Sequence, residues 1–272
     1  MSMFINTNVS AINAHRNLGF NNTQMGKTME KLSSGYRINR AADDAAGLAI
    51  SEKMRRQING YNQALRNAQD GISLLQTAEG AMTEIHSMLQ RMNTLANQAS
   101  TGTYDSDDRA KLQSEVDELI KEIDNIAQNT NFNGIELMKA DGKVDFQVGA
   151  DKVLISADLK QTDSEKLFGA AKKLDISTST AAQNAIATLK TAIDTVSANR
   201  STLGAVQNRL EHTINNVGVN AENLAASESR IRNADMAKEM TEFTRNQILV
   251  QAGTAMLAQA NSAPQSVLKL LG

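Results

Sequence analysis

The chain has 272 residues, a net charge of −2, one proline and neither cysteine nor tryptophan. Aromatic residues make up only 3% of it, whereas a compact core of this size usually takes much of its buried area from large aromatic side chains. The absence of cysteine excludes disulfides and thiolate metal sites, and the near-neutral charge gives no basis for nucleic-acid binding. The apolar residues are mainly Ala, Leu, Ile, Val and Met, which suit long helices packed side by side.

The N-terminal segment is amphipathic in part. Residues 1–18 lack the basic start and apolar run of a secretory signal, and no apolar stretch in the chain is long enough to span a membrane. We therefore expect no membrane insertion. The spaced apolar residues of this segment are Val9, Ile12, Leu18, Met25, Met29 and Leu32.

A heptad repeat follows and is the dominant signal of the sequence. Apolar or small residues alternate at spacings of three and four, as in a coiled-coil seam. Asp43 and Asp44 provide the acidic residues of a helix start, so a helix is predicted from Asp43 to Ala99. At 1.5 Å per residue it is roughly 85 Å long and needs partners along its whole length. The seam positions are Ile50, Met54, Gln57, Tyr61, Ala64, Ala68, Gly71, Leu75, Ala78, Met82, Ile85, Leu89, Met92, Ala96 and Ala99.

A second, shorter helix is predicted after a break at residues 100–103, and the short break indicates that it folds back on the first. Asp105, Asp107 and Asp108 stand at its start. They lack the turn glycine and closing glutamate of an EF-hand calcium loop, so helix capping is favoured over calcium binding. Residues 129–134 have loop chemistry and end the helix. Its seam is Leu112, Val116, Leu119, Ile123 and Ile126.

The next segment predicts a small β-hairpin near residues 143–157. Val144, Phe146 and Val148 alternate with polar residues, and the alternation resumes after residues 149–151, which can form a three-residue loop. Residues 160–180 have a mixed pattern that predicts no element.

A second long heptad covers residues 186–231. Arg200, Gln207 and Glu228 occupy seam positions where apolar residues are expected; either they set register or partner choice, or the seam is partly open there. After Ile231 the register shifts to Met236, Met240, Phe243, Gln247, Val250, Thr254 and Leu257. Such a slip indicates a new packing partner, and we expect a domain boundary near it. Pro264 is predicted to end this helix.

Apolar helices at both chain ends are unusual, because termini are normally exposed and frayed. Neither end has an obvious place to be buried within one molecule of this composition. Burial against neighbouring copies of the chain is the natural solution.

Five segments resemble the signature sequences of bacterial flagellins. Near the N-terminus these are KLSSGYRINRAADDAAGLAI at residues 31–50 and FNG at residues 132–134. Near the other end they are LGAVQNRL at residues 203–210, ESRIRNADMA at residues 228–237 and MLAQAN at residues 256–261. The motifs stand in the flagellin order and, apart from the ambiguous stretch before the second long heptad, the likeness covers nearly the whole chain.

The resemblance implies a mainly α fold of long antiparallel coiled-coil helices from both chain ends, with one small β-hairpin. Residues 1–42 and 232–272 would form a terminal polymerisation domain lining an inner tube, and residues 43–231 a surrounding shell. Larger flagellins insert surface domains where this chain has only residues 160–180, so no outer domain is expected. The implied candidates for subunit contacts are Leu32, Arg37, Ile38, Arg230, Arg232, Asp235, Met236, Met240, Phe243, Met256 and Leu257.

The same resemblance implies a structural role: the chain would be the homopolymeric subunit of the extracellular flagellar filament, used for swimming. It would leave the cell unfolded through the flagellar type III pathway, held at its C-terminal region by an export chaperone, and would meet flagellar cap and hook-junction proteins. It also implies recognition by the animal innate immune receptor for flagellin. Gln90, Arg91 and Leu95 match the receptor epitope on the first long helix and Glu115 matches its partner, whereas Asn93 and Thr94 depart from it.

Two other functions remain as alternatives. A hook–filament junction protein shares parts of the terminal pattern, but the intact motifs at residues 228–237 and 256–261 favour flagellin. A signalling coiled coil would need a membrane span or a sensor domain. An enzyme is disfavoured, because His15, His86 and His212 have no nucleophile, metal cluster or acidic partner in a recognisable arrangement; no cofactor or metal is expected.

Overall fold

The computed structural model describes residues 7–169 and 173–271, and the chain forms two compact units. Unit 1 contains Met1–Arg56 and Asn223–Gly272, and unit 2 contains Gln57–Glu222. The described residues form six α-helices and four short strands. The prediction of a mainly α-helical chain with long helices from both ends is therefore confirmed.

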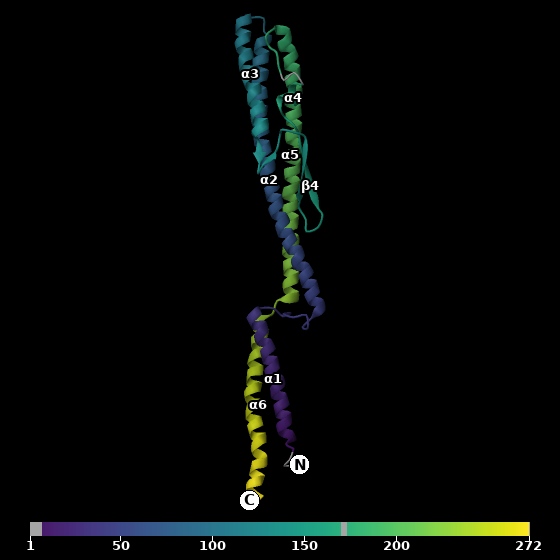
Figure 1. Cartoon of the computed structure of the whole chain (residues 1–272), viewed down its shortest axis with the longest axis vertical. Helices are drawn as coiled ribbons and strands as arrows, with labels where there is room; N and C mark the ends of the chain where they lie inside the picture. The colour runs from purple at the N-terminus through teal and green to yellow at the C-terminus, as the bar shows by residue number, and fades with distance from the viewer. Residues whose placement is uncertain (1–6, 170–172, 272) are drawn as a thin grey trace. The chain divides into compact units, whose positions relative to one another are not determined.

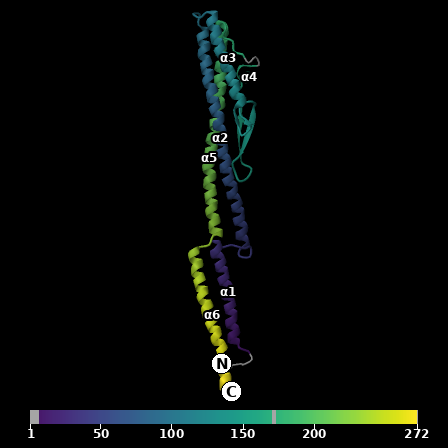
Figure 2. The same ribbon diagram turned by 60° about the vertical axis from the view of Figure 1, so that its left-hand side comes forward.

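Unit 1 is built on an antiparallel helix pair, α1 (Val9–Ser34) and α6 (Met236–Leu271), which lie side by side in Figures 1 and 2. Asn8 precedes α1, and its side-chain oxygen accepts a hydrogen bond from the backbone N–H of Ala11 at 3.0 Å. The amide nitrogen of the same side chain donates to the carbonyl of Ala260 at 2.7 Å. One asparagine thus caps α1 and ties its start to α6.

Unit 2 is built on α2 (Ala45–Ser100), α3 (Ser106–Asn129) and α5 (Ser179–Arg232), and α2 and α5 both continue into unit 1. Asp105 caps α3, as its acidic position predicted. The guanidinium of Arg109 donates to the carbonyl of Ala99, in the last turn of α2, and to that of Thr101 just after it, and this closes the short turn through which α3 folds back on α2. The resulting layer of helices is visible in Figure 1.

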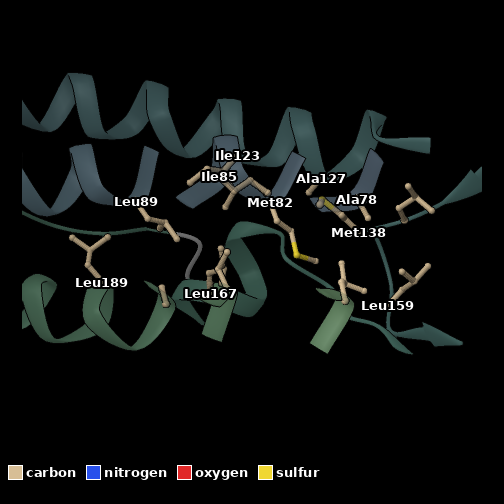
Figure 3. Close-up of a cluster of buried hydrophobic side chains, with 14 of the residues drawn as sticks. Ala78, Met82, Ile85, Leu89, Ile123, Ala127, Met138, Leu159, Leu167 and Leu189 are labelled. Atoms are coloured by element: carbon tan, nitrogen blue, oxygen red, sulfur yellow. The ribbon is translucent and has the colours of Figure 1, made fainter. Parts of the chain in front are cut away.

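The core of unit 2 follows the predicted seam of α2. From Ala64 to Ala99 every predicted seam position is buried, whereas Ile50, nearer the start of the helix, is 47% exposed. Figure 3 shows α2 residues facing α3, the hairpin region and α5. The labelled members of this cluster are Ala78, Met82, Ile85, Leu89, Ile123, Ala127, Met138, Leu159, Leu167 and Leu189.

The predicted hairpin is present as β3 (Gly142–Gln147) paired with β4 (Leu154–Leu159). Its loop was predicted too short, because Gln147 pairs with Leu154 and leaves residues 148–153 between the strands. The N–H of Val148 still donates to the carbonyl of Val153 at 2.9 Å, so the strands stay close beyond the regular ladder.

A second strand pair occurs where a simple loop was expected. β1 (Asn131–Phe132) pairs with β2 (Ile135–Glu136) across Asn133 and Gly134, both of which have positive φ (50° and 82°). Positive φ at both central residues is the two-residue hairpin turn that Asn-Gly favours. The dipeptide was the signal for this turn.

The segment between β4 and α5 is anchored on α3. It contains the short helix α4 (Ser164–Phe168), and Asp124 of α3 accepts hydrogen bonds from the backbone N–H and hydroxyl of Ser164 at 2.9 and 2.8 Å. Gln113 of α3 accepts from the N–H of Ile176 at 2.7 Å, and Ile176 is fully buried. The described part of this linker is therefore packed against the helices rather than projecting from them.

Two predicted helix boundaries differ from the structure. The register shift after Ile231 is a helix end, since α5 stops at Arg232 and α6 starts at Met236. The prediction that Pro264 ends the last helix is wrong, because α6 continues to Leu271. A proline removes one backbone donor from a helix, but the bonds formed on either side of it can carry the helix onward.

Candidate assembly surface

The α1–α6 pair leaves many large apolar side chains exposed. Phe20 of α1 is 63% exposed and Met256 of α6 is 65% exposed. Thr28 is the one buried residue of α1, all of which is described. The further exposed apolar residues of the pair are Val9, Ile12, Met29, Met236, Met240, Ile248 and Leu249.

Helix geometry explains the exposure of Val9, Ile12 and Phe20 on α1. Successive residues are rotated by about 100°, so Val9, Ile12 and Phe20 lie on one face and Leu18 and Met25 on the opposite face. Leu18 and Met25 are half-buried on the pair's inner side. A lone partner helix covers one stripe only, and α1 has two.

On α6 the seam lies beside the predicted one. Met236 and Met240 point outward. The positions that face α1 between the half-buried apolar residues are Glu239, Asn246 and Gly253, each of which directly precedes a predicted seam residue in the sequence. Gly253 admits Leu18, whose Cδ1 lies 3.4 Å from the point a Cβ would occupy. Small and polar residues in the seam thus turn the methionines outward, where they remain available.

An ion pair crosses the pair's seam. Lys31 Nζ lies 3.2 Å from Glu239 Oε1, and the residue Glu239 is 7% exposed. The second oxygen, Oε2, is buried without a hydrogen-bond partner among the described residues. Together with Asn8 at the other end of α1, this contact sets the antiparallel register of α1 and α6.

The chain segments that leave the helix pair form a joint, residues 35–38 and 231–235. The N–H of Arg37 donates to the carbonyl of Arg232 at 2.7 Å, and the N–H of Ala234 donates to the carbonyl of Gly35 at 2.9 Å. The Arg37 guanidinium donates to the carbonyl of Ile231, so it caps the C-terminal end of α5.

Arg232 links the joint to α2. Its guanidinium lies 4.9 Å from the ring centroid of Tyr36 and pairs with Glu52. Ile38 is 2% exposed and packs against Gly47, where an added Cβ would lie 2.9 Å from the Ile38 Cδ1.

Asp43, just beyond the joint, orders the loop that leads into α2. Its Oδ2 accepts hydrogen bonds from the N–H groups of Arg40 and Asn39 at 2.9 and 3.1 Å. These bonds stabilise the carboxylate and hold the pKa of Asp43 below its ordinary value.

The structure divides the predicted subunit-contact residues into two groups. Met236, Met240 and Met256 are exposed, and Leu32, Phe243 and Leu257 are half-buried along the α1–α6 pair. The others have partners within the chain. Arg37, Ile38 and Arg232 build the joint, Asp235 accepts from the N–H groups of Ala237 and Lys238 at the start of α6, and Arg230 donates to Ser227.

The predicted receptor epitope is partly assembled on the surface of unit 2. Arg91 of α2 and Glu115 of α3 form an ion pair with Nε and Nη2 at 2.8 and 2.7 Å from Glu115 Oε1. Gln90 is exposed and contacts His86. Leu95 lies in the core and is 1% exposed.

Within the described residues, no cluster of His, Cys, Asp or Glu could hold a metal ion. No described helix is long and apolar enough to cross a membrane.

Two family models match most of the sequence. The bacterial flagellin N-terminal helical region matches residues 5–142, and the bacterial flagellin C-terminal helical region matches residues 186–271. The chain belongs to the bacterial flagellin family. It is therefore a structural subunit of the flagellar filament and not an enzyme.

Curated flagellins match along their whole length. A flagellin of Halalkalibacterium halodurans is 56% identical over 99% of this chain and all of its own. A flagellin of Bacillus subtilis is 50% identical with the same coverage. A putative hook-associated protein from Vibrio parahaemolyticus shares the fold over 70% of this chain and all of its own, with a TM-score of 0.60 and 11% identity. That likeness concerns the fold alone, whereas the identity to flagellins extends over the full chain.

Proposed function

We propose that this flagellin polymerises by burying the outward apolar side chains of α1 and α6 between neighbouring copies. The exposure of residues such as Phe20, Met240 and Met256 is the observation that supports it. Burying a large apolar side chain contributes roughly 1.5–3 kcal/mol relative to leaving it exposed. Nine such residues on one helix pair therefore supply a large driving force for assembly once the entropy of association is offset.

The proposed polymerisation domain consists of residues 1–42 and 232–272, and residues 43–231 form the shell. The joint supports this division, because α1 and α5 both end there and the two chain segments are tied to each other by backbone hydrogen bonds. A head-to-tail contact between different surfaces of identical copies does not close on itself and gives an open helical filament.

The proposed route to the filament follows from the family. The chain would be exported unfolded through the flagellar type III pathway to the extracellular filament, where a flagellar cap and hook-junction proteins are its neighbours. The export chaperone would bind the C-terminal region, whose outward methionines need cover before assembly. An animal innate receptor would read the surface around Gln90, Arg91 and Glu115, where the Arg91–Glu115 pair supports a preformed epitope.

Seeded polymerisation tests the proposed assembly surface. Purified monomer would be added to filament seeds, with growth followed by light scattering and electron microscopy. We expect the triple variant Met236→Ser, Met240→Ser and Met256→Ser to stay monomeric and helical while the unmodified chain elongates. Val219→Ser is the matched control, because Val219 is 58% exposed on α5 in unit 2.

Removing residues 1–42 and 232–272 should likewise give a soluble helical monomer. Equal elongation by the triple variant and the unmodified chain would contradict the proposed surface. Failure of the unmodified chain to elongate, with its ends protected from protease, would instead mean that the terminal helices complete their packing within one molecule.

A further inference from the structure

Unit 2 has an open apolar groove that nothing in the described chain fills. It has a volume of about 450 Å³ and lies between α2, the β1–β2 turn and β3. Its apolar lining includes Leu74, Phe132, Ile135, Val144 and Phe146, and Ile135 is 43% exposed. Asp70 stands among these residues, is exposed and forms no ion pair with any described residue.

The tip of the β3–β4 hairpin has complementary properties. Val153 and Leu154 are 52% and 54% exposed, and they follow Lys152, an exposed cation without an ion pair in the described chain. On β4 the next residue, Ile155, is 6% exposed and faces the core, so Leu154 points to the opposite side of the strand. The tip is a small apolar projection with a positive charge beside it.

Contacts within the loop stabilise the conformation of the tip. Gln147 donates through its side-chain amide to the carbonyls of Gly149 and Asp151 on the other side of the loop. Val153 packs over Gly149, where an added Cβ would lie 2.8 Å from the Val153 Cβ. A preorganised projection loses little conformational entropy when it binds.

The tip faces away from the groove of its own chain, because Leu154 pairs with Gln147 and so lies on the opposite face of the strand pair from Phe146, which lines the groove. Ala150 lies against Gly60 of α2, and Phe146, which lines the groove, lies over Gly71. The eleven residues from Gly60 to Gly71 correspond to roughly 16 Å along the helix. The strand register and these two contacts hold the hairpin along α2 in this orientation, so the exposed side chains of its tip are directed toward other molecules and not into the groove of its own chain.

We propose that the hairpin tip of one copy, Lys152–Leu154, docks in the groove of a neighbouring copy. Val153 and Leu154 meet the apolar lining, and Lys152 lies beside Asp70. The tip and the groove are different surfaces present once on each copy, so this contact propagates head to tail instead of closing into a dimer. The inference rests on the proposed polymerisation and adds a specific second contact outside the α1–α6 pair.

Cysteine cross-linking tests the contact directly, because the chain contains no cysteine of its own. The double variant Asp70→Cys and Lys152→Cys would be assembled on seeds, oxidised mildly and run on a non-reducing gel. A disulfide requires the two Cα atoms to lie within about 7 Å, and only a disulfide between two copies links chains into a ladder. We expect a ladder of dimers, trimers and longer species from filaments and none from monomer.

The matched control pairs Lys152→Cys with Glu84→Cys, since Glu84 is exposed on α2 and lies outside the groove. Filaments of the Asp70 and Lys152 double variant that give no more ladder than this control would overturn the docking contact and leave the proposed polymerisation intact. If the unmodified chain forms no filament on seeds, both proposals fail together.

A charge exchange provides the second measurement. Asp70→Lys and Lys152→Asp should each slow elongation several-fold, because each places like charges at the contact. The two changes combined should restore the unmodified rate. Rates that are unchanged in both single variants would also overturn the contact.

Discussion

Removing the Glu79 carboxylate should destabilise unit 2 through two contacts that cross from α2 to α5. Glu79 Oε2 accepts a hydrogen bond from Gln207 Nε2 at 3.2 Å, and Oε1 lies 3.8 Å from Arg200 Nη2. Arg200 and Gln207 are two of the polar residues that interrupt the predicted seam of α5. The structure therefore gives them a common partner, which favours a role in register over an open seam.

The magnitude follows from the exposure of the two charged groups. The side chains of Arg200 and Glu79 are 32% and 37% exposed, so solvent screens their attraction and the ion pair contributes no more than about 0.5 kcal/mol. The hydrogen bond to a charged acceptor contributes about 1–1.5 kcal/mol. Glu79→Ala should thus lower the free energy of unfolding by about 1.5–2 kcal/mol. Glu79→Gln keeps an acceptor for Gln207 and should cost about half as much.

Urea unfolding of the monomeric full chain, followed by circular dichroism, measures these changes. A double-mutant cycle with Glu79→Ala and Gln207→Ala should show a coupling energy of about 1 kcal/mol. Glu84→Ala is the matched control and should change stability by less than about 0.5 kcal/mol, because Glu84 is exposed on the same helix. A coupling energy near zero would refute the contact as a determinant of α2–α5 packing.

Three further outcomes are expected of the monomer. Leu89→Ala should lower the free energy of unfolding by about 2–5 kcal/mol, because Leu89 is fully buried, whereas Val219→Ala, at an exposed site, should cost little. Gly134→Ala should lower the free energy of unfolding by about 1–2 kcal/mol, because Gly134 has a positive φ. Gly80→Ala should raise it by about 0.5–1 kcal/mol, because Gly80 lies within α2 and faces open space. Urea unfolding measures the change for each variant and its control. The pKa of Asp43 is lower in the folded chain than its ordinary value of 3.8, so its carboxylate stabilises the fold at pH values above 3.8. This stabilisation is lost as the pH falls through the lower pKa of the folded chain. Asp43→Asn should therefore flatten the dependence of unfolding free energy on pH in that range.

The local pattern of the sequence was sufficient for the helices and for the core of unit 2. Spacings of three and four place apolar residues on one face, and from Ala64 to Ala99 that face is the buried one. The same reasoning was less accurate on α6, where Met236 and Met240 belong to the apolar repeat but point outward. A repeat identifies a stripe, but which of two adjacent stripes meets a partner depends on residues of another helix, here Leu18 opposite Gly253.

For the candidate surfaces too, the sequence identifies residues and the fold decides what they contact. The sequence motifs made Arg37, Ile38 and Arg232 candidates for contacts between subunits, but the fold shows that they build the joint within one chain. The groove beside Asp70 had no counterpart in the sequence, because its walls come from α2, the β1–β2 turn and β3.

The sequence by itself determined the helical class, the flagellin family and the absence of thiol chemistry, since these depend on composition, periodicity and motifs that are contiguous along the chain. Only the tertiary structure decided which apolar residues stay exposed, which acid the seam residues Arg200 and Gln207 meet, and which residues line the groove beside Asp70. Those properties depend on distances between residues far apart in the chain, and such distances are set by packing rather than by local propensity.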